Sequence, residues 1–155
     1  MFLFLVTLIA NGNDKTPMNY ESYHGHDNYW KVIPEVVLCQ KQSVFTYEQV
    51  EDALVLWKKK YSKITVSNDC SYDQERGKIK IVDGKYLKPR QWGYTSFIYS
   101  KRVENGKSVK AYSSAIVQLD KRVRNTNILV HELGHAFGID HYDKTYDIMN
   151  SYATY

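Results

Sequence analysis

The spacing of three histidines constrains the local fold more than any other feature of the sequence. They are His131, His135 and His141, and they make up three of the five histidines among 155 residues. The segment Asn125–Phe137 is predicted to be a helix, because a capping residue begins it and apolar residues recur along it. On a helix, residues four apart lie one above the other, so His131 and His135 share a face. Two imidazoles placed in this way can bind one zinc ion.

The residues around these two histidines extend the pattern to a catalytic metal site. Gly138 is expected to let the chain leave the helix with a positive φ, which glycine adopts without steric cost. The turn would bring His141 back as a third ligand, and catalytic zinc sites keep three protein ligands and one position open for water. Glu132 lies one residue along the helix and can accept a proton from a metal-bound water. The pattern therefore predicts metal-assisted hydrolysis, and ordinary core histidines are the alternative that it disfavours.

The remaining patterns predict one mixed α+β domain with an α/β-like order of elements. A chain of 155 residues with 43% hydrophobic and 25% charged residues suits a single globular domain and excludes intrinsic disorder. A capping box and a helical apolar stripe predict a helix from Thr46 to about Tyr61. Because it separates two short strands, these strands should be parallel. The expected strands are 32–39, 64–66, 78–82, 92–103 and 108–119, and Asn105-Gly106 should close a hairpin between the last two.

The stretch His131–His141, HELGHAFGIDH, resembles the zinc-binding motif of the metzincin metalloproteases. Members of this family also carry a Met-turn shortly after the third histidine, and Asp147–Asn150 matches it in position and type. The resemblance implies that Met149 forms a hydrophobic floor beneath the histidines. It also implies a zincin-like catalytic domain, with a twisted mixed sheet of about five strands, a backing helix and an active-site helix. Residues 31–155 would form this domain.

The same resemblance implies where a substrate would lie. The last strand before the active-site helix, about Ala111 to Leu119, would be the edge strand that lines the cleft. An extended polypeptide would pair with its free backbone groups, which places Ser113, Ser114, Ala115 and Ile116 in contact with substrate. Some metzincins place a tyrosine near the zinc after the methionine, and Tyr152 is a candidate for that role or for packing alone.

The N-terminal region leaves two interpretations open. The apolar run Phe2–Ala10 suits the core of a secretory signal or a buried strand, and it is too short for a standard membrane span. Residues 1–30 are therefore a candidate leader and extended segment, in which His24 and His26 could touch a metal or simply be solvated. Cys39 and Cys70 could form one disulfide or remain two buried thiols. A secreted location is favoured by the apolar run together with the cysteine pair.

These observations support three hypotheses about function. The first is a zinc endopeptidase that binds one Zn²⁺, with a polypeptide substrate. The second is a catalytically silent zinc-binding module that mediates protein interaction, although such a module has no need of Glu132. The third is an interaction protein whose 14 tyrosines supply the contact surface. A net charge of +4 is too small to imply nucleic acid, no membrane span is expected, and a monomer is the simplest assembly.

Overall fold

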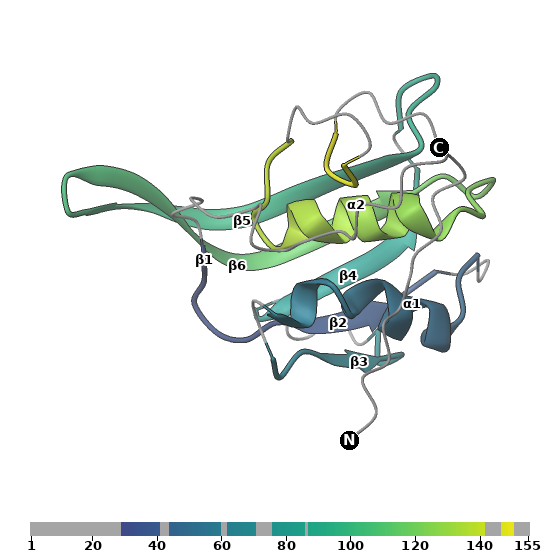
Figure 1. The fold of residues 1–155 in the computed structure, drawn as a ribbon, viewed down its shortest axis with the longest axis horizontal. Helices are drawn as coiled ribbons and strands as arrows, with labels where there is room; N and C mark the ends of the chain where they lie inside the picture. The colour runs from purple at the N-terminus through teal and green to yellow at the C-terminus, as the bar shows by residue number, and fades with distance from the viewer. Residues whose placement is uncertain are drawn as a thin grey trace.

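A computed structural model describes residues 29–40, 44–59, 62–70, 76–85, 87–141 and 147–150. Over these residues the chain forms a mixed α+β domain, as the sequence predicts (Figure 1). The apolar run Phe2–Ala10, the pair His24 and His26, and Tyr152 lie outside the described residues.

Six strands form one sheet (Figure 1). The path β1-β6-β4-β2-β3 runs entirely through parallel pairs, and β5 pairs with β6 in the antiparallel direction. The predicted strand–helix–strand unit is confirmed, because β2 and β3 are parallel and α1 lies between them in the chain. The strands are β1 (Tyr29–Trp30), β2 (Glu35–Leu38), β3 (Thr65–Ser67), β4 (Lys78–Asp83), β5 (Gly93–Glu104) and β6 (Lys107–Leu119).

The predicted hairpin joins β5 to β6. Asn105 and Gly106 both have positive φ values, 52° and 76°. Two consecutive positive φ values are the requirement of a type I′ turn, whose twist matches that of the strands it connects. The long β5–β6 ribbon is therefore closed by the turn that the Asn-Gly pair specifies.

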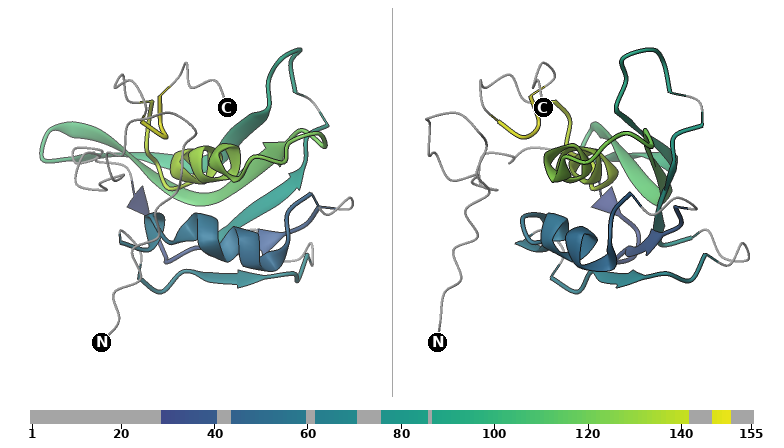
Figure 2. Two further views of the ribbon diagram at one scale, coloured as in Figure 1. Left: turned by 45° about the vertical axis from the view of Figure 1, so that its right-hand side comes forward. Right: turned by 90° about the vertical axis from the view of Figure 1, so that its right-hand side faces the viewer.

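Both helices lie on one side of the sheet (Figure 2). Helix α1 (Tyr47–Leu54) begins with the predicted capping box, in which Thr46 and Gln49 satisfy each other's backbone N–H groups. It ends earlier than the apolar stripe predicts and is followed by the short 3-10 helix η2 (Trp57–Lys59). Helix α2 (Thr126–Ala136) is capped by Asn125, whose side chain accepts from the Asn127 N–H at 2.9 Å.

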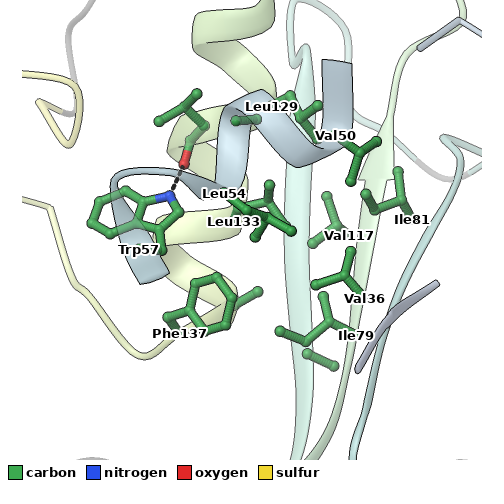
Figure 3. Packing of buried hydrophobic residues seen from close by; sticks show 14 of the residues in the cluster. Val36, Val50, Leu54, Trp57, Ile79, Ile81, Val117, Leu129, Leu133 and Phe137 are labelled. Atoms are coloured by element: carbon green, nitrogen blue, oxygen red, sulfur yellow. Dashed lines mark hydrogen bonds between the residues drawn. The ribbon is translucent and has the colours of Figure 1, made fainter. Parts of the chain in front are cut away.

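The core fills the space between the sheet and the two helices (Figure 3). Trp57 is fully buried there, and its indole Nε1 donates to the Val130 carbonyl of α2 at 3.0 Å. Trp30 donates in the same way to the Ala136 carbonyl at 2.9 Å. These two indoles tie η2 and β1 to successive parts of α2. The apolar residues around them include Val36, Val50, Leu54, Ile79, Ile81, Val117, Leu129, Leu133 and Phe137.

The prediction of an edge strand is wrong for β6. Over Ser114–Leu119, β6 pairs with β4 and with β5 at once, so its two edges are both occupied. β5, by contrast, is an edge strand, because among the described strands it pairs with β6 alone. Ser113, Ser114, Ala115 and Ile116 therefore have no free strand edge to offer a substrate. The hairpin turn itself does not specify which of its two strands faces the rest of the sheet, because long-range pairing decides that.

The predicted disulfide is confirmed. Cys39 follows β2 and Cys70 follows β3, and a disulfide joins them with 5.5 Å between their Cα atoms. Such a bond is compatible with an extracellular location. Within the part of the chain that the structure describes, neither helix is long and apolar enough to cross a membrane.

Candidate metal centre

Helix α2 places two histidines on one of its faces. His131 and His135 are four residues apart, and their ring centroids lie 4.7 Å from each other. The rest of the helix is anchored by apolar side chains in the core, so the histidine face is held in a fixed orientation. The first part of the predicted ligand arrangement thus follows from the helix period alone.

A glycine turn at the end of α2 brings in the third histidine. Gly138 has a φ of 86°, as the sequence predicts. The Gly138 N–H donates to His135 O at 2.7 Å and the Ile139 N–H donates to Gly134 O at 3.0 Å, which is the Schellman pattern. The chain then turns back, and His141 Nε2 lies 3.1 Å from His135 Nε2. One nitrogen from each of the three histidines falls within 4.8 Å of the others.

Backbone carbonyls select the tautomer of two of these rings. His131 Nδ1 contacts the Ile148 carbonyl, and His135 Nδ1 lies 2.8 Å from the Ile139 carbonyl. A carbonyl oxygen can only accept, so each Nδ1 must carry the hydrogen. The Nε2 atom of each neutral ring then keeps its lone pair. Carbonyl partners of this kind are typical of histidines that bind a metal.

The electrostatics of the cluster favour neutral rings. Burial lowers the pKa of His131, and burial together with the neighbouring His131 lowers the pKa of His135 to about 4. Both rings are therefore neutral at pH 7, and the lone pair of His135 lies close to the His141 ring nitrogen. Zn–N distances of about 2.0–2.1 Å allow two ligand nitrogens to be 3.1 Å apart. The three-imidazole set fits a metal ion, and imidazole suits zinc as well as copper, iron and nickel.

Glu132 points to the start of β5. The Thr95 hydroxyl lies 2.7 Å from Glu132 Oε2 and 3.0 Å from the Glu132 backbone oxygen. Gly93 lies against the same side chain, because a Cβ atom at Gly93 would come within 2.5 Å of Glu132 Oε1. Burial raises the pKa of Glu132 to about 7, although the Thr95 hydrogen bond acts in the opposite direction. A carboxyl group with this pKa can both accept and donate a proton near neutral pH.

The turn that contains Met149 packs against the same helix. The Met149 N–H donates to Asp147 Oδ1 at 2.8 Å and the Asn150 N–H donates to Asp147 O at 3.0 Å. Met149 is fully buried. A Cβ atom at Gly134 would lie 2.4 Å from Met149 Sδ, so only glycine lets the methionine approach the helix this closely. The Ile148 carbonyl that holds His131 belongs to this turn as well.

The structure brings together most of the predicted site, and it adds residues that the sequence analysis did not single out. His131, His135 and His141 form one cluster, and Glu132 is buried beside them on α2. Ser114 and Ile116 instead line a shallow hollow with Lys78 and Lys80 from β4. The residues missed are Gly93, Thr95 and Gly134. A glycine at a strand start or inside a helix marks close approach of another group, and that signal was present at Gly93 and Gly134.

Comparison with known proteins agrees with this geometry. Residues 99–155 match the family model Peptidase M66, which describes a metallopeptidase family. No curated protein matches the chain. The match spans 57 of the 155 residues, and it includes β6, α2 and all three histidines. The family match and the histidine cluster together suggest that the protein is a metallopeptidase.

Proposed function

We propose that the protein is a zinc-dependent endopeptidase. The observation that carries the proposal is the convergence of three histidine nitrogens within 4.8 Å, two of them from rings whose Nδ1 atoms are engaged by backbone carbonyls. Three protein ligands leave one coordination position for water or substrate, which distinguishes a catalytic zinc site from a four-ligand structural one.

Each group of the site has its own role in the proposed hydrolysis. Zinc, when bound, supplies a Lewis acid that makes water a better nucleophile and polarises a carbonyl group. Glu132 accepts the proton of the attacking water and passes it to the nitrogen of the departing amine. Burial raises the pKa of Glu132 to about 7 without a metal, and a bound cation would act in the opposite direction and favour the carboxylate form that accepts the proton. Met149 is proposed as the apolar floor that supports the helix under the histidines.

The edge of β5 is the proposed binding surface for an extended polypeptide. Among the described strands β5 pairs with β6 alone, and its first residues contact Glu132. A polypeptide that added as a further strand would therefore run past the catalytic carboxylate. Because a strand edge accepts the middle of a chain as readily as its end, this arrangement favours internal cleavage.

One substitution tests the mechanism. The wild-type protein should bind about one zinc per chain and cleave an unfolded protein such as casein, while Glu132→Ala should keep the zinc and lose at least 10²-fold in kcat, in line with general-base contributions of about 10²–10⁴-fold. Glu48→Ala, at an exposed position of α1, is the matched control and should cleave casein at the wild-type rate. Cleavage that survives Glu132→Ala contradicts the mechanism, and a wild-type protein without zinc contradicts the site. Zinc binding by a wild-type protein that cleaves nothing favours the silent binding module.

Export from the cytosol is a second part of the proposal. It is supported by the Cys39–Cys70 disulfide, since such bonds persist in oxidising compartments. The mass of the mature N-terminus tests it: removal of about residues 1–10 to 1–20 supports export, and an intact Met1 in protein from the native source contradicts it.

A further inference from the structure

We propose that Thr95 and Gly93 of β5 act together as positioning residues that hold the Glu132 carboxylate in its working orientation. This inference rests on the proposed role of Glu132 as proton acceptor. Neither residue belongs to the histidine motif, and they precede Glu132 by 37 and 39 positions in the chain. We call the pair the carboxylate seat.

The hydroxyl of Thr95 lies within hydrogen-bond reach of two Glu132 oxygens and has a single hydrogen to donate between them. Its Oγ1 is 2.7 Å from the carboxylate Oε2 and 3.0 Å from the backbone oxygen of the same residue. The Glu132 side chain must therefore fold back over the hydroxyl and cannot extend freely from α2. Glu132 is only 6% exposed, and Thr95 is the side chain that hydrogen-bonds its carboxylate among the described residues. Loss of the hydroxyl would leave a buried carboxylate without this partner, and such a group reorients or draws in water.

Gly93 supplies the space that the carboxylate occupies. A Cβ atom at this position would lie 2.5 Å from Oε1, 2.6 Å from Cγ and 2.7 Å from Cδ of Glu132. Gly93 has no positive φ, so its backbone could accommodate any residue, and the requirement for glycine comes from the neighbouring carboxylate alone. Tyr94 lies between the two seat residues in the chain. Because side chains alternate along a strand, its side chain lies on the opposite face, where it is about half exposed. The hydrogen bond and the missing side chain are independent observations that point to the same group.

A purely structural tie between α2 and the sheet explains these contacts less well. Helix α2 is already fixed by its buried apolar residues and by the indoles of Trp30 and Trp57. A carboxylate is a poor group for holding a helix against a sheet, because its charged form is costly to bury. Its presence here therefore points to another use. The seat is therefore best understood as a device that holds one reactive group at a defined place relative to β5, along which the substrate would lie.

The test compares two substitutions at Thr95. Thr95→Val keeps the shape and removes the hydroxyl, and Thr95→Ser keeps the hydroxyl. We expect Thr95→Val to lower kcat about 10- to 100-fold for casein cleavage, since misplacement of a catalytic group by about 1 Å can cost about 10²-fold. KM should stay within about threefold and zinc content should not change, because neither depends on the orientation of Glu132. Thr95→Ser should recover kcat to within about threefold of the wild type. Thr65→Val on β3 is the matched control for loss of a strand threonine, and it should have wild-type kcat.

A second variant and a structural measurement keep the test independent of folding and of activity. Gly93→Ala should displace the carboxylate directly and lower kcat at least as far as Thr95→Val. In crystal structures of the metal-free variants, Glu132 should leave the seat in Thr95→Val and Gly93→Ala and remain there in Thr95→Ser. The inference is overturned if Thr95→Val keeps kcat within twofold of Thr65→Val, or if Thr95→Ser fails to recover it. Glu132→Gln assayed in parallel separates the two failures: an active Glu132→Gln rejects the proposed function, while an inactive Glu132→Gln with an active Thr95→Val rejects the seat alone.

Discussion

At the scale of single residues, the site depends on side chains whose ordinary protonation is shifted by burial. His135 has its pKa lowered to about 4 and Glu132 has its pKa raised to about 7, so both groups are biased toward their neutral forms. Burial disfavours the ionised form of Glu132. A cation bound between the histidines would favour that form. The metal-free protein should therefore lose stability when Glu132 ionises.

The substitution Glu132→Gln should reveal this cost through its pH dependence. The folded-state pKa of Glu132, about 7, lies above its ordinary value of 4.5. The stability that the neutral carboxyl contributes is thus complete below about pH 4.5 and is lost as the pH rises through about 7. In the metal-free protein, Glu132→Gln should increase the free energy of unfolding at pH 8 by on the order of 2–3 kcal/mol and change it little at pH 4.5.

Urea unfolding of EDTA-treated protein at the two pH values measures the effect. Glu48→Gln, at an exposed position of α1, is the comparison for replacement of a glutamate by glutamine. A gain from Glu132→Gln that does not depend on pH would show that burial of the charge is not its cause.

At the scale of elements, α2 contains a glycine, which is an unfavourable residue inside a helix. Gly134 lies in the last turn of the helix, two residues before its end, and a glycine inside a helix costs up to about 1 kcal/mol of helix stability relative to alanine. Its lack of a side chain admits Met149 from the turn Asp147–Asn150 and Trp57 from η2, both of which would contact a Cβ atom below 3 Å. The helix gives up local stability in order to pack closely against two other segments.

Gly134→Ala should therefore destabilise the protein despite its better helix propensity. The added methyl would lie 2.4 Å from Met149 Sδ and 2.8 Å from Trp57 Cζ2, and overpacking of this kind costs about 1–3 kcal/mol. Urea unfolding of Gly134→Ala, Met149→Ala and the double variant forms a cycle. The double variant should recover part of the loss, because removal of the sulfur relieves one of the two close contacts. Additive losses would mean that the methyl is accommodated elsewhere.

The elements also show what the sequence could and could not predict. Local signals succeeded: the capping box at Thr46, the Asn105-Gly106 turn and the positive φ of Gly138 each depend on a few neighbouring residues. The prediction of the edge strand was wrong at β5 and β6, because both segments are long and rich in β-branched and aromatic residues. The stretch Ala115–Leu119 is more continuously apolar than its partner, which is typical of an inner strand and was the available signal.

The residues of the candidate metal centre were predictable to different degrees for the same reason. Its three histidines and Glu132 are readable because a helix and a glycine turn relate them over eleven residues. Gly93, Thr95 and the Ile148 carbonyl reach the site through tertiary packing, so no local pattern identifies their partners.

At the scale of the whole molecule, the disulfide joins the segments that follow β2 and β3 and closes a loop around α1. Cys39 and Cys70 are 31 positions apart. Loop closure over this distance should stabilise the fold by about 2–4 kcal/mol, chiefly by restricting the unfolded chain. Reduction by dithiothreitol should therefore lower the urea midpoint of the metal-free wild-type protein.

The double variant Cys39→Ser/Cys70→Ser is the control for that experiment. Its midpoint should match that of the reduced wild type and should not respond to dithiothreitol. A wild-type midpoint that reduction leaves unchanged would contradict the expectation.

The central place of β6 has a consequence for how the protein is made. β1, β4 and β5 all pair with β6, although β1 and β4 precede it in the chain by long stretches. During synthesis, β4 therefore emerges from the ribosome with one edge unpaired. Ile79 and Ile81, which belong to the core, stay uncovered until the later strand and helix have been made. Folding must be dominated by such late, distant pairings, which slow it and expose strand edges to aggregation. The histidine cluster can form only after β6 has joined the sheet and α2 has packed on it, so a nascent chain cannot hold an assembled centre before its fold is nearly complete.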